Sequence, residues 1–326
     1  MLSVDNTQHM LEQKYRPQSI SECILPRHDM DRFNGLVKKG KFPHLLLCSK
    51  SPGTGKTTVA MALVNDIDAE MMFITGGQLR INDLRTPLTE FANTSTRKKG
   101  GKVIIIDEGD NTNMRSVHEE LRSWMEAYSD NCSIIMTCNN AEVIPEALKS
   151  RFRVFEFGRI VEETPELVKA DETRMKKEMF VRCMAICEAE GIEVKDKRAM
   201  MALVSKNFPN FRSAITEMDK YSSCGYIDEG VLTSTMRSTK DMEKLFELMK
   251  NKDLPEIRSL IPNFSTNYPA FINAFYERAT TQVKGQSYRM LIKILAENQK
   301  TVGDVPNIEI HLMDMLSDLA CEVNWK

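Results

Sequence analysis

Residues 44–67 read HLLLCSKSPGTGKTTVAMALVNDI, and this stretch decides the fold. A short apolar run comes first, a glycine-containing loop follows at 50–57, and an apolar helical pattern begins directly after it. Glycines let backbone N–H groups turn inward around phosphate oxygens, Lys56 can reach the terminal phosphates, and Thr57 offers a hydroxyl to Mg²⁺. The stretch predicts a phosphate-binding loop, although Lys50 occupies the place of the usual first glycine. The plainer alternative is a glycine turn that only caps a helix.

A second motif supports this interpretation. Residues 104–108 read IIIDE, a buried strand that ends in two adjacent carboxylates. Asp107 can hold Mg²⁺ through water, and we expect Glu108, on the other side of the pleat, to polarise an attacking water molecule. Alone, the pair could be two exposed acids after a strand. In the same sheet as the glycine loop, it predicts a nucleotide-hydrolysing site.

Two weaker features follow at the next strand and turn. Asn139, after the predicted strand at 132–136, lies where an amide can orient water or touch the last phosphate. Arg151 lies on a predicted exposed turn, and its planar guanidinium suits phosphate stabilisation, including delivery from a neighbouring subunit. Asparagine is also common in turns, and arginine is common on surfaces, so these plainer interpretations stay open.

The hydrophobic pattern changes along the chain. Between 42 and 157, apolar runs alternate with amphipathic stretches, which predicts an open parallel sheet with helices on both faces. We expect these strands to be buried on both faces, at 44–48, 71–75, 103–106 and 132–136. The helices between them are expected near 57–67, 81–92 and 113–127.

After Pro165 the strand pattern stops, and only helical periodicity remains. It predicts a small bundle from helices at 170–190, 196–206 and 211–222. Further helices follow Lys240, with starts or stops expected at Pro255, Pro262, Pro269 and Pro306. The predicted domains are an α/β nucleotide-binding domain at 1–165, a helical lid domain at 166–230 and a helical domain at 231–326.

Composition excludes several classes of protein. The chain has 326 residues, 42% of them apolar, with 44 Lys and Arg against 46 Asp and Glu, which is typical of a globular protein. No apolar run approaches the ~20 residues that span a bilayer, so we expect no membrane partner and no secretion. The eight cysteines form no C-x-x-C pair, which favours reduced thiols. With a net charge of −2, any nucleic-acid contact must rely on local positive charge.

These motifs, in this order, resemble the AAA+ ATPases. The opening EQKYRP at 12–17, together with Asn139 and the Ser150-Arg151 turn, narrows the resemblance to the sliding-clamp loaders of DNA replication. Within that family the resemblance is closest to the bacteriophage members. It covers the whole chain, through LRSWMEAY at 121–128 and NFR at 210–212.

The resemblance implies an AAA+ domain with a lid and a C-terminal collar, and ATP and Mg²⁺ as cofactors. It makes Asp107 and Glu108 the Walker B pair, with Thr57 and Asp107 at the metal. Asn139 becomes sensor 1, Arg151 the trans-acting arginine finger and Arg212 sensor 2, which enters from the lid. It assigns the adenine wall to Glu12, Gln13, Lys14, Tyr15 and Ile24, and the phosphates to Gly53, Thr54, Gly55, Lys56, Thr57 and Thr58.

The function that the resemblance implies is a DNA-dependent ATPase subunit that opens a ring-shaped clamp and places it on primer–template DNA. Its partners would be the clamp, a different small loader subunit, further copies of itself and the DNA, in the cytoplasm of a bacterial host. The alternatives are another AAA+ DNA remodeller, such as a helicase loader or Holliday-junction motor, and a non-hydrolysing scaffold subunit. Lys50, Gly109, His118 and Phe152 depart from the family pattern.

Overall fold

The structure is a computed structural model that divides into two compact units, Met1–Val231 and Leu232–Lys326. The structure describes residues 3–5, 7–8, 10–158, 160, 164–222, 226–227, 241–265, 268–303 and 305–325. The predicted domain boundary at 230–231 lies outside these residues.

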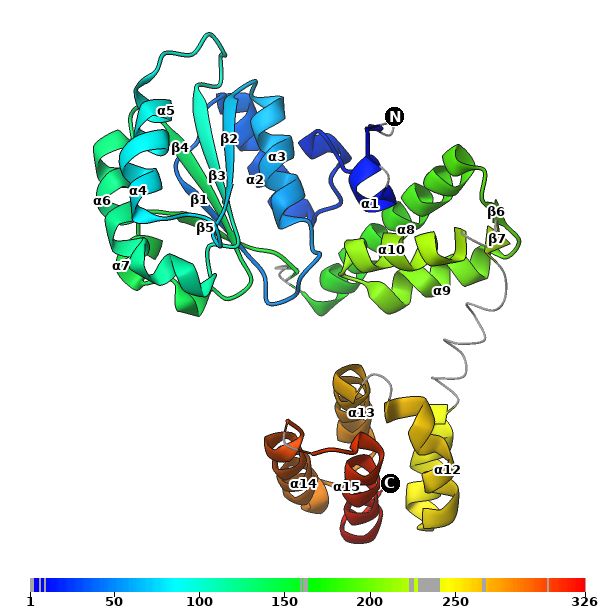
Figure 1. Cartoon of the computed structure of the whole chain (residues 1–326). Coiled ribbons are helices and arrows are strands. Elements are labelled where there is room, and N and C mark those ends of the chain that lie inside the picture. Colours follow the sequence, from blue (N-terminus) through cyan, green and yellow to red (C-terminus); the bar gives the residue numbers. More distant parts are fainter. Residues whose placement is uncertain are drawn as a thin grey trace. The chain divides into compact units, whose positions relative to one another are not determined.

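A five-stranded parallel sheet forms the centre of the first unit (Figure 1). The strand order is β2-β3-β4-β1-β5, so the strand that precedes the glycine loop lies inside the sheet, between β4 and β5. The strands are β1 (Leu45–Cys48), β2 (Glu70–Thr75), β3 (Lys102–Asp107), β4 (Ser133–Cys138) and β5 (Arg153–Glu156). Because all five are parallel, their carboxyl ends meet at one edge of the sheet, where ligands bind in this architecture.

Successive strand residues pack into two separate cores, one on each face of the sheet. Leu45 and Leu47 join the core under α2 and α3, whereas Leu46 and Cys48 join the core on the opposite face. Figure 1 shows the two helical layers, with α2 and α3 on one side and α4 to α7 on the other. The predicted α/β architecture is therefore confirmed. The helices of this part are α1 (Leu11–Lys14), α2 (Arg27–Lys39), α3 (Lys56–Asp66), α4 (Ile81–Asp83), α5 (Thr89–Asn93), α6 (His118–Tyr128) and α7 (Glu146–Lys149).

The helix expected at 81–92 is interrupted. A π-helical turn at Leu84–Leu88 separates α4 from α5, and it contains Pro87. Proline lacks the N–H that would donate the regular α-helical hydrogen bond at this position. The helical turn therefore includes one additional residue. The Thr89 hydroxyl donates to the Leu84 carbonyl at 2.7 Å and in turn accepts from Trp124 Nε1 at 2.9 Å. The expected helix at 113–127 likewise begins as a 3₁₀ turn, Thr112–Ser116, before α6.

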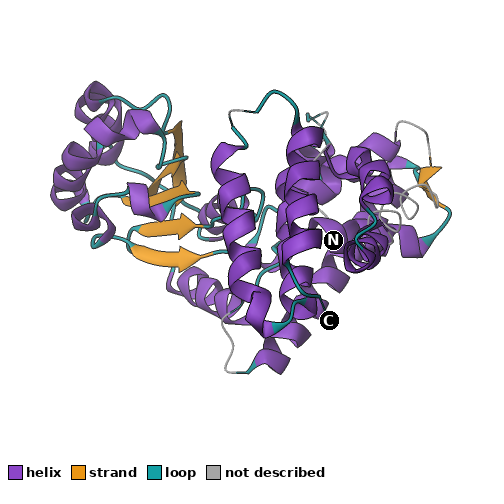
Figure 2. Cartoon of the chain, turned by 90° about the horizontal axis from the view of Figure 1, so that it is seen from below, coloured by secondary structure: helices purple, strands orange, loops and turns teal. Residues whose placement is uncertain are grey.

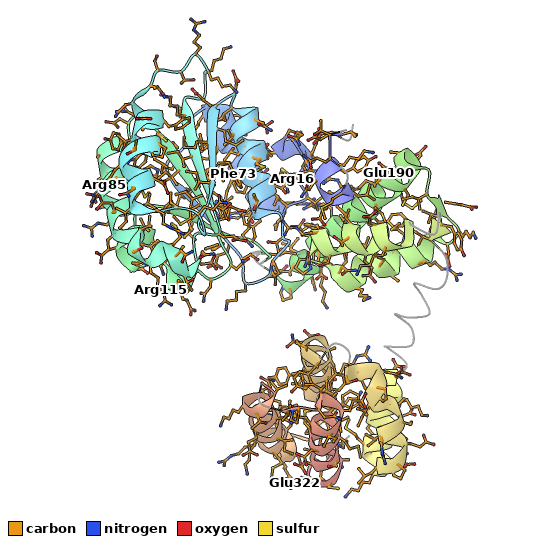
Figure 3. All side chains as sticks on the ribbon, viewed as in Figure 1. Arg16, Phe73, Arg85, Arg115, Glu190 and Glu322 are labelled. Atoms are coloured by element: carbon orange, nitrogen blue, oxygen red, sulfur yellow. The ribbon has the colours of Figure 1, made fainter. Side chains whose placement is uncertain are left out.

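The expectation that every strand is buried on both faces is wrong for β2. This strand lies at the end of the sheet order, and its side chains alternate between half-buried and exposed. Met71 and Phe73 remain 42% and 40% exposed, and Figure 3 labels Phe73 on this strand. Apolar composition alone did not distinguish an edge strand from a central one.

The lid region of the first unit consists of α8 (Pro165–Glu190), α9 (Lys197–Asn207) and α10 (Phe211–Ser222). Helix α8 begins where the Thr164 hydroxyl accepts the Leu167 N–H and ends at Gly191, whose φ of 69° suits a left-handed C-cap. The prediction that strands stop after Pro165 needs one correction. Two-residue strands β6 (Glu193–Val194) and β7 (Tyr226–Ile227) pair in parallel.

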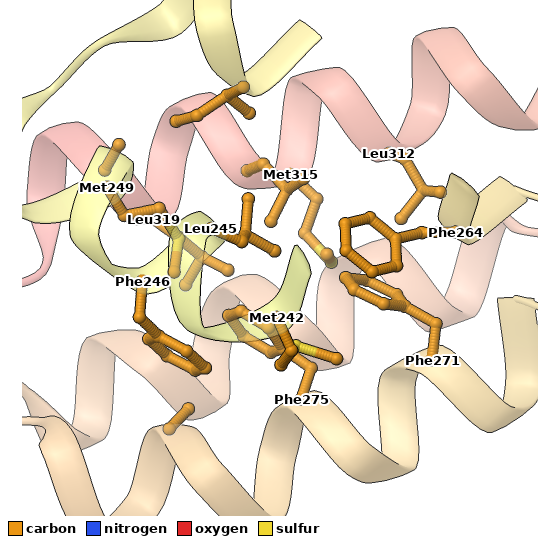
Figure 4. Close-up of a cluster of buried hydrophobic side chains, with 14 of the residues drawn as sticks. Met242, Leu245, Phe246, Met249, Phe264, Phe271, Phe275, Leu312, Met315 and Leu319 are labelled. Atoms are coloured by element: carbon orange, nitrogen blue, oxygen red, sulfur yellow. The ribbon is translucent and has the colours of Figure 1, made fainter. Parts of the chain in front are cut away.

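The second unit is helical in the part that the structure describes, as expected. Apart from the short β6–β7 pair, strands drawn in Figure 2 belong to the central sheet. Phe246 stacks on Phe275 at 5.1 Å, and Trp325 meets Phe246 edge-on, within the apolar core of Figure 4. Pro262 lies inside α12 instead of ending a helix. The helices span 241–251, α12 (Leu254–Ser265), α13 (Tyr268–Gln282), α14 (Tyr288–Thr301) and α15 (Ile308–Glu322).

Within the described residues, none of the helices combines the length and the apolar character that crossing a bilayer requires.

Substitution of Phe155 tests the packing of the core between the sheet and α2. Phe155 is 1% exposed and stacks on Phe33 with ring centroids 4.7 Å apart. We expect Phe155→Ala to lower the free energy of unfolding of the first unit by about 3–5 kcal/mol, because the truncation leaves a cavity. Urea unfolding measures this, with the 40% exposed Phe73→Ala as control. Equal losses in the two variants would contradict the packing described here.

Candidate nucleotide-binding site

A cavity of about 220 Å³ opens at the carboxyl edge of the sheet. The glycine loop after β1, the acidic end of β3 and the end of β4 form one side of it. The N-terminal segment and lid residues from α8 and α10 form the other side. The predicted site residues that line this cavity are Glu12, Tyr15, Ile24, Gly53, Thr54, Gly55, Lys56, Thr57, Thr58, Asp107, Glu108, Asn139 and Arg212.

Gly53 brings the phosphate-binding loop against the lid. Its φ is +72°, and a Cβ built there would lie 1.9 Å from Asn210 Oδ1 and 3.2 Å from Arg212 Cβ. The Gly53 carbonyl accepts the N–H groups of Phe211 at 3.1 Å and Arg212 at 3.4 Å. Only glycine permits this approach, so the start of α10 is bonded directly to the loop.

Lys56 and Asn139 bond to each other in the lining of the cavity. Lys56 is 8% exposed, and its Nζ donates to Asn139 Oδ1 at 2.9 Å and to the Ser51 carbonyl at 3.3 Å. Burial is the main cause that lowers the pKa of Lys56. The Asp110 carboxylate accepts the N–H groups of Asn139 at 3.0 Å and Asn140 at 2.8 Å, and so fixes this turn. Asp110 was not predicted from the sequence, because the N–H groups that it accepts lie in the turn after β4, about 30 residues further along the chain.

Asp107 joins three elements of the site. Its Oδ1 accepts the hydroxyl of Thr57 at 2.7 Å and that of Thr137 at 2.6 Å. A carboxylate beside a hydroxyl supplies hard oxygen donors, the ligands that Mg²⁺ prefers. The residues present therefore fit a magnesium ion bound with a nucleotide.

The position of Glu108 corrects one expectation. Strand β3 ends at Asp107, and Glu108 has φ of +57°, so strand alternation does not place it on the opposite side. Both carboxylates line the same cavity. The Thr137 hydroxyl accepts the Glu108 N–H at 3.1 Å, which supports this uncommon backbone conformation.

The N-terminal segment supplies the end of the cavity that is expected to hold the base. Glu12, Tyr15 and Ile24 line it, whereas Gln13 and Lys14 are not among the described lining residues. Lys14 Nζ instead donates to Glu190 at 2.6 Å, and the Tyr15 hydroxyl bonds to the same carboxylate. Burial, followed by this hydrogen bond, raises the pKa of Tyr15 to about 12. Figure 3 labels Glu190 at the end of α8.

Arginines crowd this side of the cavity. Arg212 lines it and lies 4.0 Å from Glu12, whose other oxygen accepts the Thr216 hydroxyl at 2.6 Å. Arg16 and Arg182, which were not predicted from the sequence, also line the cavity. Burial lowers the pKa of the Arg16 guanidinium, and the positive charge of Arg212 adds to the effect. The position of Arg16 in the EQKYRP stretch was the signal that could have identified it.

Arg151 lies away from this cavity. It follows α7 and is not among the described residues that line the pocket. Its Nη2 pairs with Glu126 Oε1 at 2.5 Å, and both side chains are about half exposed. The structure therefore leaves Arg151 on the surface, outside its own chain's site.

The departures from the family pattern have local explanations. Lys50 is exposed and is not among the described residues with positive φ, so its position does not require glycine. A Cβ on Gly109 would lie 2.5 Å from Met136, which occupies that space. Phe152 is 8% exposed and joins the core. His118 is 1% exposed, and its Nε2 donates to the Gly109 carbonyl at 3.0 Å.

His118 gives a prediction on pH. Burial lowers its pKa from 6.5, so below that pH the unfolded chain binds more protons than the folded chain. The stability that neutral His118 contributes is present above pH 6.5 and is lost as the pH falls towards the folded pKa. Between about pH 7.5 and about pH 5.5, we expect His118→Gln to lose less free energy of unfolding than the unchanged chain. Urea unfolding at both pH values measures this, and parallel losses would contradict it.

Comparisons with known proteins match each part of the chain. The model of the ATPase family associated with various cellular activities (AAA) matches residues 46–159. The sliding-clamp-loader large subunit models match the AAA+ ATPase lid domain at 171–233 and the C-terminal domain at 267–324. The structure is also similar to that of a RuvB mutant from Thermotoga maritima, with TM-score 0.51 and 17% identity, covering 75% of this chain and 85% of that chain. This likeness shows the shared fold alone.

Sequence relatives narrow the family. The replication factor C small subunit of Archaeoglobus fulgidus is 30% identical over 78% of each chain. The sliding-clamp-loader large subunits of Escherichia phage RB69 and Enterobacteria phage T4 are 46% and 43% identical over the full length of both chains. The chain therefore belongs to the family of sliding-clamp-loader large subunits, which are AAA+ ATPases.

Proposed function

We propose that this clamp-loader ATPase binds ATP with Mg²⁺ in the 220 Å³ cavity and couples its hydrolysis to loading a ring-shaped clamp on primer–template DNA. The convergence of Lys56, Asp107, Glu108 and Asn139 on that cavity carries the proposal. Its partners would be the clamp, a small loader subunit, further copies of this chain and the DNA. The phage relatives support the cytoplasm of a bacterial host as the place of action.

The proposed roles follow from chemistry and position. The loop 53–58 and Lys56 would bind the phosphates, and Thr57 and Asp107 would hold Mg²⁺, which supplies charge neutralisation when bound. The exposed Glu108 carboxylate would accept a proton from the attacking water, and Asn139 would orient that water. Arg212 would contact the last phosphate from the lid. Glu12, Tyr15 and Ile24 would enclose the base, with Gln13 and Lys14 supporting them from outside.

DNA and neighbouring subunits would meet other surfaces. Loading at any sequence requires no reading of bases, so we expect DNA to be held mainly through its phosphates. Residues 231–326 would serve as an oligomerisation collar, and 166–230 as the lid of the ATPase domain 1–165. The relatives favour clamp loading over a helicase loader or a Holliday-junction motor. The presence of Lys56, Glu108 and Arg151 argues against a non-hydrolysing scaffold.

Two substitutions separate binding from hydrolysis. We expect Lys56→Ala to abolish tight ATP binding, because the phosphates lose their principal cation. We expect Glu108→Gln to bind ATP but lose turnover, because only the activation of water is removed. Nucleotide titration and steady-state turnover on both variants decide this. Normal turnover in the Glu108 variant would exclude the catalytic role proposed for that residue.

Arg151 is expected to act on a neighbouring subunit. Arg151→Ala should leave ATP binding nearly intact while slowing hydrolysis by roughly 10³-fold or more, as for arginine fingers in general. Assemblies that mix Arg151→Ala chains with Lys56→Ala chains should recover part of the activity, since some interfaces pair an intact loop with an intact arginine. Turnover that stays absent, despite confirmed mixing of subunits, would favour a plain surface arginine.

A further inference from the structure

One face of the lid helix α8 is bonded to the backbone of the segment 22–27. Asp171, Arg174 and Arg182 lie on this face, spaced at three and eight residues along the helix, which places them above one another. Their partners are the Glu22 carbonyl, the Leu25 carbonyl and the Arg27 N–H. All three contacts cross from the lid to the N-terminal segment. We name these three side chains the α8 latch.

Asp171 is the buried centre of the latch. It is 3% exposed, and its Oδ2 accepts the Arg27 N–H at 3.1 Å. Arg27 is the first residue of α2, and Pro26 before it provides no side-chain cap. Asp171 therefore caps α2 from another helix, where a negative charge also meets the positive end of the helix dipole. Its Oδ1 accepts Arg174 Nε at 2.7 Å, so the buried charge is paired.

The two arginines of the latch donate hydrogen bonds to backbone carbonyl groups. Arg174 Nη2 donates to the Leu25 carbonyl at 2.6 Å while its Nη1 pairs with Glu178 at 2.7 Å. Arg182 Nη2 donates to the Glu22 carbonyl. Charge-assisted hydrogen bonds of this kind are the stronger ones in proteins, and the planar guanidinium fixes their direction.

The segment that the latch holds is part of the nucleotide cavity. Cys23, Ile24 and Leu25 line that cavity, as do Met179 and Arg182 of α8. Leu25, Pro26 and Met175 also help to line a second cavity of about 30 Å³. Cys23 and Leu25 pack into the core under α2 and α3, and the hydrogen bonds from α8 add a second restraint on the backbone of 22–27. The bonds from α8 orient the Glu22 and Leu25 carbonyls and the Arg27 N–H, which apolar packing cannot do.

We propose that the α8 latch positions the 22–27 backbone to receive the nucleotide base, so that affinity for the base, but not for the phosphates, depends on the lid helix. The inference rests on the proposed nucleotide site. Asp171 and Arg174 are positioning residues, because they act through Leu25 and Arg27. The latch lies far from the loop 53–58 in sequence and bonds to none of its residues through the contacts described above.

Asp171→Asn in the full chain tests the inference, since it removes the charge but keeps the shape of the side chain. ATP and inorganic tripolyphosphate, which lacks the base and the ribose, are titrated against both proteins. We expect ATP affinity to fall about tenfold, the effect of weakening charged hydrogen bonds, and tripolyphosphate affinity to change less than about twofold. Comparison of the two ligands separates a loss at the base from a general loss of stability.

Glu172→Gln is the matched control. It makes the same charge change on the next residue of α8, where the carboxylate pairs with Lys176 at 2.5 Å and touches no residue of 22–27 in the contacts that the structure describes. We expect it to bind both ligands like the unchanged chain. If Asp171→Asn fails to fold, Arg174→Lys serves instead. The single lysine ammonium group can keep the ion pair to Asp171, but it lacks the planar guanidinium that also donates to the Leu25 carbonyl.

Three outcomes are distinguishable. A selective loss of ATP affinity supports the latch. Equal losses for ATP and tripolyphosphate, or no loss for either in Asp171→Asn, overturn it. An unchanged chain that binds neither ligand would instead refute the proposed nucleotide site itself.

Discussion

The absence of a side chain at Gly53 is the constraint on which the arrangement of the site depends. Because Asn210 and Arg212 occupy the space that a Cβ would need, the phosphate-binding loop and the start of α10 approach each other at backbone distance. Two N–H groups of the lid then bond to the Gly53 carbonyl. The positions of the loop and of the start of α10 are therefore coupled directly through backbone atoms, since no side chain separates the two.

The parallel sheet supplies the other half of the arrangement. Parallel strands place their carboxyl ends at one edge of the sheet. Residues that are far apart in the chain therefore lie close together there. The Thr57–Asp107 and Lys56–Asn139 hydrogen bonds join residues from α3, β3 and the turn after β4. The lid adds contacts to the N-terminal segment through the Thr216–Glu12 hydrogen bond and the α8 latch. Two sets of polar contacts thus enclose one cavity.

The sequence predicted the features that depend on local pattern. Apolar runs and turn residues identified the strands, the glycine loop and most helices, because these follow from periodicity within a few residues. It did not predict the π-helical turn, although Pro87 was the signal, nor the exposed β2, because strand order is a long-range property. Asp110, Arg182 and Asp171 could not be identified from pattern. Each acts on backbone groups of a distant segment.

Gly109 and His118 depart from the family pattern without altering the side chains that are proposed to bind the nucleotide. Gly109, His118 and Met136 lie together behind the Walker B turn: Met136 fills the space that a side chain at 109 would take, and His118 bonds to the Gly109 carbonyl. A missing methyl group at one position is thus matched by a long side chain at another. Asp107 and Glu108 line the cavity, and the described hydrogen bonds of the Asp107 carboxylate run to Thr57 and Thr137 and not to that cluster. Substitutions at these positions therefore change the packing beside Asp107 and Glu108, while the side chains proposed to meet the nucleotide are themselves unchanged.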